Sequence, residues 1–257
     1  MATDVGSPAG DRVTELTAGL ASVRARLARA AEAAGRSVEE ITLLPVTKFF
    51  PAGDVAILWR LGCRSFAESR DQEASAKIAE FDRLIATASQ PGPAHWHMVG
   101  QIQRNKAKHI AAWADTVHSV STEAVAAALD RGAAAALADG RRTRPLRVFV
   151  QISLDGDTSR GGVDIGDPAA VDALCALVAE SPALHLVGLM GVPPLGVDPD
   201  VAFTALATER HRVRQTHPGA TELSAGMSDD LEAAVRHGST CVRVGTALMG
   251  KRPLTSP

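Results

Sequence analysis

Lys48 is the residue best placed to do covalent chemistry. It follows the apolar stretch ITLLPVT (41–47), and Phe49, Phe50 and Pro51 come directly after it. A lysine at the end of a strand, flanked by apolar side chains, is partly desolvated, and its amine is then freed to form a Schiff base. A surface lysine whose stem covers apolar neighbours is the alternative, and position alone leaves both open.

Two small turns near the C-terminus could hold an anion. The stretch SAGMS (224–228) passes from a strand-like run into a helix-like run, so its backbone N–H groups and the Ser228 hydroxyl can face a phosphate. Gly245 and Thr246 offer a second small turn with a hydroxyl group. An ordinary helix cap at Ser228 is the alternative, with the two aspartates that follow it complementing the helix dipole. Because carboxylates repel phosphate, we expect those aspartates to face away.

Arg243 lies on the same face of its predicted strand as Cys241 and Gly245, within a mostly apolar run. A buried guanidinium needs an acceptor. Arg243 could pair with a carboxylate in the wall of the fold, or it could donate to a bound heteroaromatic ring. The spacing leaves both possibilities open.

Metal and disulfide chemistry have little support in the sequence. His95 and His97 share one face of a predicted strand, but no third ligand stands at a suitable spacing. The three cysteines, Cys63, Cys175 and Cys241, are far apart and form no C-x-x-C motif. Neither a disulfide framework nor a zinc site is therefore indicated.

The elements that position these residues alternate along the chain. Short apolar runs predict strands at 41–47, 63–68, 95–100, 116–120, 146–153, 185–191, 221–226 and 241–249. Apolar residues at helical spacing predict a helix over 11–34, which Gly35 ends. Further helices are predicted at 54–61, 72–88, 105–112, 122–138, 168–179, 201–215 and 229–237.

This alternation predicts an α/β fold, a single TIM-type (β/α)8 barrel over 11–250, because eight parallel strands close such a barrel. We expect a frayed, disordered tail over 1–10 and a C-terminal tail over 251–257. The chain ends too soon after the last strand for another helix, so the extra N-terminal helix could cover that gap. Active sites of these barrels lie at the C-terminal ends of the strands, where Lys48 and both turns fall. A doubly wound open sheet is the alternative architecture.

Composition and charge limit the classes of molecule that the chain is expected to bind. Hydrophobic residues make up 46% and charged residues 22%, which is typical of a globular domain. A formal net charge of -2 gives no electrostatic basis for binding nucleic acid or an anionic membrane. No apolar run reaches the roughly 18 residues that span a bilayer, and no signal peptide is indicated. We therefore expect a cytoplasmic protein.

The chain resembles the pyridoxal phosphate homeostasis proteins, a family also called YggS-like or PROSC-like, over most of its length. The resemblance rests on the order of the segments VTK (46–48), FAES–QE (66–73), HWHMVGQIQRNK (95–106), VHSV (117–120), VQIS (150–153), GLMG (188–191), LSAGMSDDLEAAVRHGST (223–240) and VRVGTALMG (242–250). It implies a barrel like that of alanine racemase, without the second β-domain. It also implies that Lys48 holds pyridoxal 5′-phosphate as a Schiff base.

Further roles come from the same resemblance. It implies that the cofactor phosphate lies against Ser228 and the Gly245-Thr246 turn, and that Arg243 faces the pyridine nitrogen or its surroundings. We therefore predict a cofactor site built from Lys48, Asn105, Ser224, Met227, Ser228, Arg243, Gly245 and Thr246. One departure is that Ala67-Glu68-Ser69 stands where the family usually has Gly-Glu-Asn, which puts any contact of that asparagine in doubt.

The residues favour binding over turnover. Racemases of this fold use a lysine and a tyrosine on opposite faces of the substrate carbon, and this chain contains no tyrosine. An arginine at the pyridine nitrogen would also weaken the ring as an electron sink. We therefore expect a monomeric carrier in pyridoxal phosphate homeostasis, with apo forms of enzymes that need the cofactor as possible partners. The alternatives are a pyridoxal phosphate-dependent racemase, transaminase or decarboxylase, and a Schiff-base aldolase acting on a phosphorylated substrate.

Overall fold

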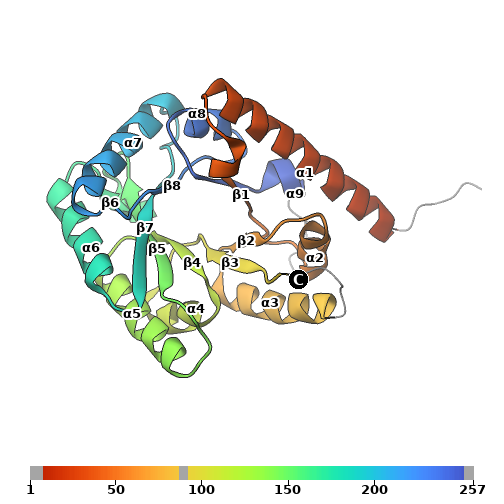
Figure 1. Cartoon of the computed structure of the whole chain (residues 1–257), viewed down its shortest axis with the longest axis horizontal. Coiled ribbons are helices and arrows are strands. Elements are labelled where there is room, and N and C mark those ends of the chain that lie inside the picture. The colour runs from red at the N-terminus through yellow and green to blue at the C-terminus, as the bar shows by residue number, and fades with distance from the viewer. Residues whose placement is uncertain (1–7, 87–91, 252–257) are drawn as a thin grey trace, which may run out of the picture.

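Parallel strands form the wall of a barrel in the computed structural model, which describes residues 8–86 and 92–251 (Figure 1). The wall strands are β1 (Thr42–Pro45), β2 (Ser65–Glu68), β3 (His95–Met98), β4 (Thr116–Val120), β5 (Leu146–Ser153), β7 (Leu184–Gly191), β8 (Glu222–Ser224) and β9 (Cys241–Val244). Their order is β1-β9-β8-β7-β5-β4-β3-β2, and the two-residue strand β6 (Val163–Asp164) pairs with β5 outside this path. A single parallel bridge between Val46 and Ala67 joins β1 to β2 and completes the ring.

Helices follow the strands and cover the outside of the barrel. They are α1 (Pro8–Ala33), α2 (Ala52–Arg60), α3 (Asp71–Ile85), α4 (Ala107–Trp113), α5 (Glu123–Ala138), α6 (Pro168–Glu180), α7 (Pro199–Thr216), α8 (Leu231–Arg236) and α9 (Thr246–Met249). Their starts follow from local chemistry. Asp167 and Asp198 cap backbone N–H groups directly before Pro168 and Pro199, and prolines suit the first position of a helix.

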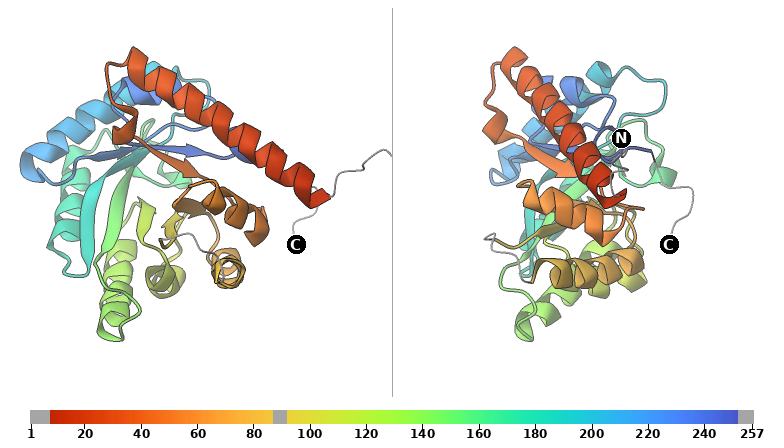
Figure 2. Two further views of the ribbon diagram at one scale, coloured as in Figure 1. Left: turned by 45° about the vertical axis from the view of Figure 1, so that its right-hand side comes forward. Right: turned by 90° about the vertical axis from the view of Figure 1, so that its right-hand side faces the viewer.

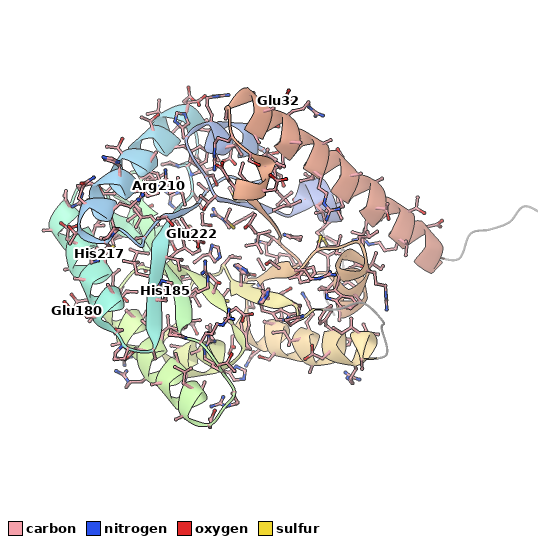
Figure 3. The ribbon with its side chains drawn as sticks, in the orientation of Figure 1. Glu32, Glu180, His185, Arg210, His217 and Glu222 are labelled. Carbon is pink, nitrogen blue, oxygen red and sulfur yellow. The ribbon has the colours of Figure 1, made fainter. Side chains whose placement is uncertain are left out.

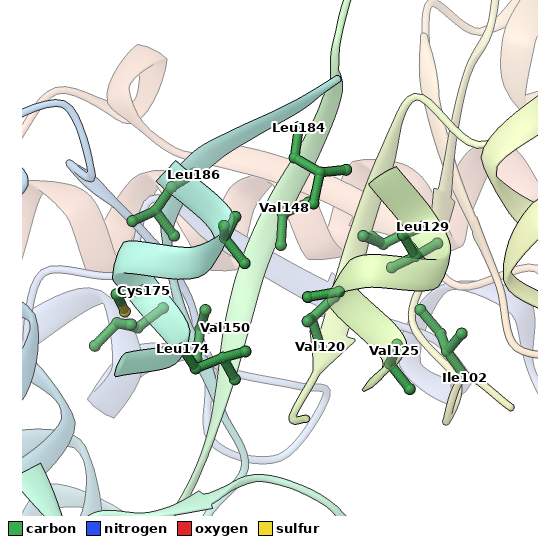
Figure 4. Packing of buried hydrophobic residues seen from close by; sticks show 14 of the residues in the cluster. Ile102, Val120, Val125, Leu129, Val148, Val150, Leu174, Cys175, Leu184 and Leu186 are labelled. Carbon is green, nitrogen blue, oxygen red and sulfur yellow. The ribbon is translucent and has the colours of Figure 1, made fainter. Parts of the chain in front are cut away.

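The main core lies between the strands and the outer helices. Val148 and Val150 of β5 pack toward Leu174 and Cys175 of α6, and Leu129 of α5 belongs to the same buried cluster (Figure 4). These side chains are almost fully removed from solvent. Burial of branched apolar residues from both layers therefore fixes the helices against the wall.

Helix α1 fills the gap after the last wall strand. Its buried stripe of Leu16, Leu20 and Leu27 joins a cluster that includes Leu248 and Met249 of α9. The backbones approach closely, because a Cβ placed on Gly19 would lie 2.6 Å from the carbonyl oxygen of Leu248. Figure 2 shows α1 lying along the side of the barrel beside the C-terminal elements. The prediction that the N-terminal helix covers this gap is confirmed.

The predicted single barrel is confirmed, and the open-sheet alternative is wrong because the Val46–Ala67 bridge joins the two ends of the sheet. The predicted strand over 241–249 is also wrong beyond Val244. Residues 246–249 form α9, whose apolar side chains face α1 instead of continuing the ladder. Helix α1 begins at Pro8, inside the predicted tail, while 1–7 and 252–257 lie outside the described residues. In the described ranges no helix is long and apolar enough to span a membrane.

Candidate cofactor site

Three neighbouring strands bring the predicted cofactor residues to one mouth of the barrel. The strands β1, β9 and β8 are adjacent in the wall and run parallel. Lys48 follows β1, Gly245 and Thr246 follow β9, and the turn containing Ser228 follows β8. The amine and both predicted anion-binding turns therefore share the C-terminal mouth, where barrels of this type place their active sites.

The Lys48 side chain is exposed at this mouth. The expectation that apolar neighbours desolvate it is wrong, because the chain changes direction directly after it. Phe49 has a φ of +70°, in the left-handed region, and Phe50 turns into the core. A bulky residue in this conformation is strained, and such strain is found at functional sites. The Lys48 Nζ lies 5.7 Å from the centre of the Phe49 ring, so this ring flanks the amine.

A buried polar network fixes the backbone just before Lys48. Lys77 donates from Nζ to the Thr47 carbonyl at 2.9 Å and to Glu68 Oε1 at 2.6 Å. The Thr47 hydroxyl donates to the same carboxylate oxygen at 2.6 Å. Burial raises the pKa of Glu68, and the charge of Lys77 opposes that rise. Thr47, Glu68 and Lys77 therefore hold the end of β1 in place.

The two predicted anion-binding turns are joined to each other. The Ser228 hydroxyl accepts the backbone N–H of Ala247 at 3.3 Å, which links the turn after β8 to the first turn of α9. Ser228 does not cap α8, since the residue at the N-cap position is Asp230. The first N–H groups of a helix lack partners within the helix. In α9, however, the N–H groups of Leu248 and Met249 bond to the Gly245 carbonyl, and that of Ala247 bonds to Ser228. The linked turns therefore offer a phosphate the Ser228 hydroxyl and the N–H of Thr246, the first residue of α9.

Gly226 makes the turn after β8 possible. Its φ is +92°, and a Cβ at this position would lie 2.6 Å from the Cβ of Ala234. Asp230 accepts the Met227 N–H at 2.5 Å, so one predicted phosphate donor is already occupied. The expectation that Asp230 faces away from the turn is therefore wrong. Met227 itself is an exposed side chain.

Arg26 of α1 supports this turn from outside the barrel. It forms a two-pronged pair with Glu232, with both N–O distances 2.9 Å, and it donates to the Ser228 carbonyl at 3.0 Å. Sequence reasoning missed Arg26, because its partners lie about two hundred positions away in the chain. The N-terminal helix therefore covers the gap after the last wall strand and also positions the Ser228 turn.

Arg243 is buried inside the barrel and is held by neutral acceptors. Its Nη1 donates to the Ser224 hydroxyl at 2.6 Å, and its Nη2 donates to the Gly191 carbonyl at 3.1 Å. Burial lowers the pKa of Arg243. No ion pair with a carboxylate is found for it in the described part of the chain. The sequence left open whether Arg243 pairs with a carboxylate or donates to a bound ring. This arrangement favours the second, because its guanidinium has further N–H groups for a ligand.

A pair of histidines continues from Ser224 across the barrel interior. The Ser224 Oγ lies 2.8 Å from His118 Nδ1, and His118 Nε2 lies 2.9 Å from His97 Nδ1. His118 also stacks on Phe149, with ring centres 4.5 Å apart. Burial lowers the pKa of His97 to about 3 and that of His118 well below its usual value, so both rings are neutral at pH 7. Sequence analysis did not assign His118 to the site, although it lies in the segment VHSV (117–120).

One residue of the predicted cofactor site finds no place in this arrangement. Asn105 lies exposed in a short 3-10 turn after β3, and no described contact joins it to the other predicted residues. His97 faces His118 instead of sharing a metal with His95. Within the described ranges no cluster of three or more histidine, cysteine, aspartate or glutamate side chains could hold a metal ion.

The chemistry of this mouth fits a phosphorylated aldehyde that carries a heteroaromatic ring. An exposed amine can attack the carbonyl carbon. The linked turns offer a hydroxyl and an N–H group to a phosphate, and Arg243 can donate to a ring acceptor. The donor set therefore suits pyridoxal phosphate.

Comparisons with known proteins agree with this chemistry. A model of the family described as alanine racemase, N-terminal domain, matches residues 19–253. A pyridoxal phosphate homeostasis protein of Mycobacterium tuberculosis is 64% identical over 259 aligned positions, covering 100% of both chains. The structure of PipY from Synechococcus elongatus with PLP bound is 32% identical, with a TM-score of 0.75, and the match covers 91% of this chain and 100% of PipY.

Alanine racemase from Corynebacterium glutamicum shares the fold alone. It is 16% identical with a TM-score of 0.61, and the match covers 89% of this chain and 60% of the racemase. The family model and the Mycobacterium tuberculosis relative cover most or all of the chain, and the relative is 64% identical. The chain therefore belongs to the pyridoxal phosphate homeostasis protein family, built on the barrel of the alanine racemase N-terminal domain.

Proposed function

We propose that this chain holds pyridoxal 5′-phosphate on Lys48 as a Schiff base and keeps it available to other proteins. The observation that carries this proposal is the bond between Ser228 and Ala247, which unites the two turns on the strands next to Lys48. The relative with PLP bound supports the choice of ligand. When bound, the cofactor supplies an electrophilic carbon that amines can attack.

The residues around Lys48 suit storage and transfer. The side chain of Lys48 is exposed, so an amine from another protein can approach the same carbon. Thr47, Glu68 and Lys77 hold its backbone, while the linked turns bind the phosphate through an N–H group and a hydroxyl. Apo forms of enzymes that need the cofactor are the expected recipients.

Turnover is not the proposed role. A guanidinium keeps its protons at neutral pH, so Arg243 can donate a hydrogen bond to the pyridine nitrogen but does not protonate it. The sequence has no tyrosine to act as a second acid or base opposite Lys48. We place the protein in the cytoplasm as a monomer; its three free, buried cysteines suit a reducing compartment.

The test is reduction of the loaded protein with borohydride. The full chain with pyridoxal phosphate should show a visible absorption band that borohydride removes, and mass spectrometry should find the reduced adduct on the Lys48 peptide. Lys48→Ala should lose band and adduct, while Lys108→Ala, at an exposed lysine of α4, should keep both. An adduct confined to other lysines would contradict the proposal.

The same samples separate the alternatives. Exchange of the α-proton of an amino acid into D2O, lost in Lys48→Ala, would point to a racemase or a related enzyme. A protein that takes up no pyridoxal phosphate, but is trapped by borohydride with a phosphorylated sugar, would point to an aldolase.

A further inference from the structure

A cavity lies at the opposite end of the barrel from the cofactor site. Its volume is about 910 Å³, and the first or second residue of each wall strand lines it, including Thr42, Ser65 and Cys241. His185 and Glu222, from the start of β7 and β8, also line it (Figure 3). This N-terminal mouth of a TIM-type barrel usually serves stability alone. Here polar side chains surround a hollow large enough for a small molecule.

Arginines dominate the charge of this cavity. Its lining includes Arg141, Arg142, Arg144 and Arg147, and the carboxylates among the lining residues are Asp115 and Glu222. The excess of guanidinium groups favours an anion over a cation.

Contacts within the protein occupy most of these arginines. Arg147 pairs with Glu222, and Arg141 pairs with Asp139. Arg142 donates to backbone carbonyls at the end of α4. Arg144 differs, because within the described residues its guanidinium has no hydrogen bond or ion pair and is exposed at the rim. It is available to a ligand.

The pair formed by the buried His118 and the half-buried His97 adds a second donor. A guanidinium only donates, so the Ser224 oxygen accepts from Arg243. The single Ser224 proton then points to His118 Nδ1, which is a stronger acceptor than the neighbouring Cys241 thiol. His118 therefore carries its proton on Nε2 and donates it to His97 Nδ1.

His97 is left with its proton on Nε2. His97 lines the cavity. The guanidinium of Arg243, which always donates, therefore fixes the His97 Nε2–H as a donor at the other end of the barrel. Both rings are neutral, so this donor does not depend on protonation at pH 7.

We propose that the N-terminal mouth of the barrel binds a small-molecule oxyanion, a carboxylate or a phosphate, through the His97 Nε2–H and the guanidinium of Arg144. The Arg147–Glu222 ion pair also lines the cavity and adds no net charge to it. This site lies at the opposite end of the barrel from the Lys48 mouth, and the hydrogen bonds from Arg243 to His97 link the two.

The test reads His97 directly. In the full chain labelled with 15N, side-chain spectra should show both His97 and His118 protonated on Nε2. Inorganic phosphate and succinate, added separately, should each be tested for a saturable shift of the His97 resonances, and at least one of them should give it. The one that binds more tightly identifies the oxyanion class.

Matched variants decide whether the shift reports this site. Arg144→Gln should weaken binding about tenfold, the loss expected for one charge-assisted hydrogen bond. Arg131→Gln, at an exposed arginine of α5 outside the cavity, should leave the affinity unchanged. Ser228→Ala should also leave it unchanged, which separates this site from phosphate bound at the cofactor turns.

Three results would overturn the proposal. One is the absence of a saturable His97 shift with either anion. Another is equal affinity in Arg144→Gln and the unchanged protein. The third is a proton on Nδ1 of His118, which would remove the donor at His97. None of these depends on whether Lys48 carries the cofactor.

Discussion

Arg243 donates from Nη1 to the Ser224 hydroxyl over 2.6 Å inside the barrel. Both residues are buried, and burial lowers the pKa of the arginine because no carboxylate in the described ranges pairs with it. A buried cation without an ionic partner depends on the dipoles around it. Ser224 therefore decides where the guanidinium points, and it also links the cofactor mouth to His118 and His97.

Replacement of Ser224 by alanine should remove the acceptor of Arg243 and leave a buried donor unsatisfied. We expect a loss of about 1–3 kcal/mol in the free energy of unfolding, together with weaker retention of pyridoxal phosphate. Urea unfolding and equilibrium dialysis measure the two effects. Ser75→Ala is the control, since that hydroxyl only donates to the Asp71 carbonyl within α3. Equal stability in both variants would show that Arg243 does not depend on Ser224.

Arg26→Gln should loosen the Ser228 turn without unfolding the protein. The Arg26–Glu232 pair is partly exposed, so its loss should cost about 0–1 kcal/mol of stability. Retention of pyridoxal phosphate should fall severalfold, because the contact that fixes the Ser228 carbonyl is lost. Arg29→Gln removes the same charge one turn along α1, at an exposed residue without a described hydrogen bond. If both variants lose the cofactor equally, net charge rather than positioning is responsible.

Local patterns in the sequence predict much of the fold and part of the site. Alternating apolar runs give the barrel, and a lysine after one strand with small turns after two others gives the mouth that gathers Lys48, Ser228 and Gly245. Each of these signals lies within a few residues of its own strand. Because the strands are parallel, their C-terminal ends meet at one mouth and bring the signals together.

The missed features are contacts across the fold. His118 meets Ser224 from 106 positions away, and nothing near it in the sequence marks it as buried beside an arginine. The exposure of Lys48 follows from the left-handed backbone of Phe49, which no propensity predicts for a bulky aromatic residue. Residues 246–249 form a helix because Leu248 and Met249 pack against α1, and the short sequence TALM alone favours a strand equally well.

Lys77→Met should leave the buried Glu68 carboxylate without its charged partner. Within the described residues Glu68 Oε2 has no hydrogen-bond partner, and loss of Lys77 removes the charge that opposes the effect of burial on the Glu68 pKa. We expect a loss of about 3–5 kcal/mol at pH 7. Glu68→Gln combined with Lys77→Met should lose much less, and Lys108→Met, at an exposed lysine, should be nearly neutral. Urea unfolding of the unchanged protein, Lys77→Met, Glu68→Gln and the double variant gives the coupling free energy between the two side chains.

The same variant should depend on pH in a definite direction. The pKa of Glu68 is raised by burial, so the folded state of Lys77→Met favours the neutral acid. Its destabilisation should therefore be smallest below the ordinary pKa of 4.5 and should grow as the pH rises toward 7. A cost that stays constant over this range would show that Glu68 keeps its charge without Lys77.

The neutral histidine pair should make the whole protein sensitive to acid. Burial lowers the pKa of His97 from 6.5 to about 3, with Arg147 and His95 adding to the effect, and it also lowers the pKa of His118. In the unfolded chain both rings bind a proton at a higher pH than they do in the folded protein. Their contribution to stability is therefore complete above pH 6.5 and is lost as the pH falls toward 3.

Between pH 6.5 and 4.5 we expect His97 alone to account for a loss on the order of 2 kcal/mol. In the double variant His97→Gln/His118→Gln, the dependence of the unfolding free energy on pH should flatten over this interval, even if stability at pH 7 falls. His211→Gln, at an exposed histidine of α7, should keep the slope of the unchanged protein. Most carboxylates titrate below this interval. A slope that stays steep in the double variant would therefore show that the two histidines do not cause it. In the unchanged protein, His97, His118 or both would then accept a proton in the folded state. The hydrogen-bond order from Arg243 to His97, which depends on both rings being neutral, would then fail as well.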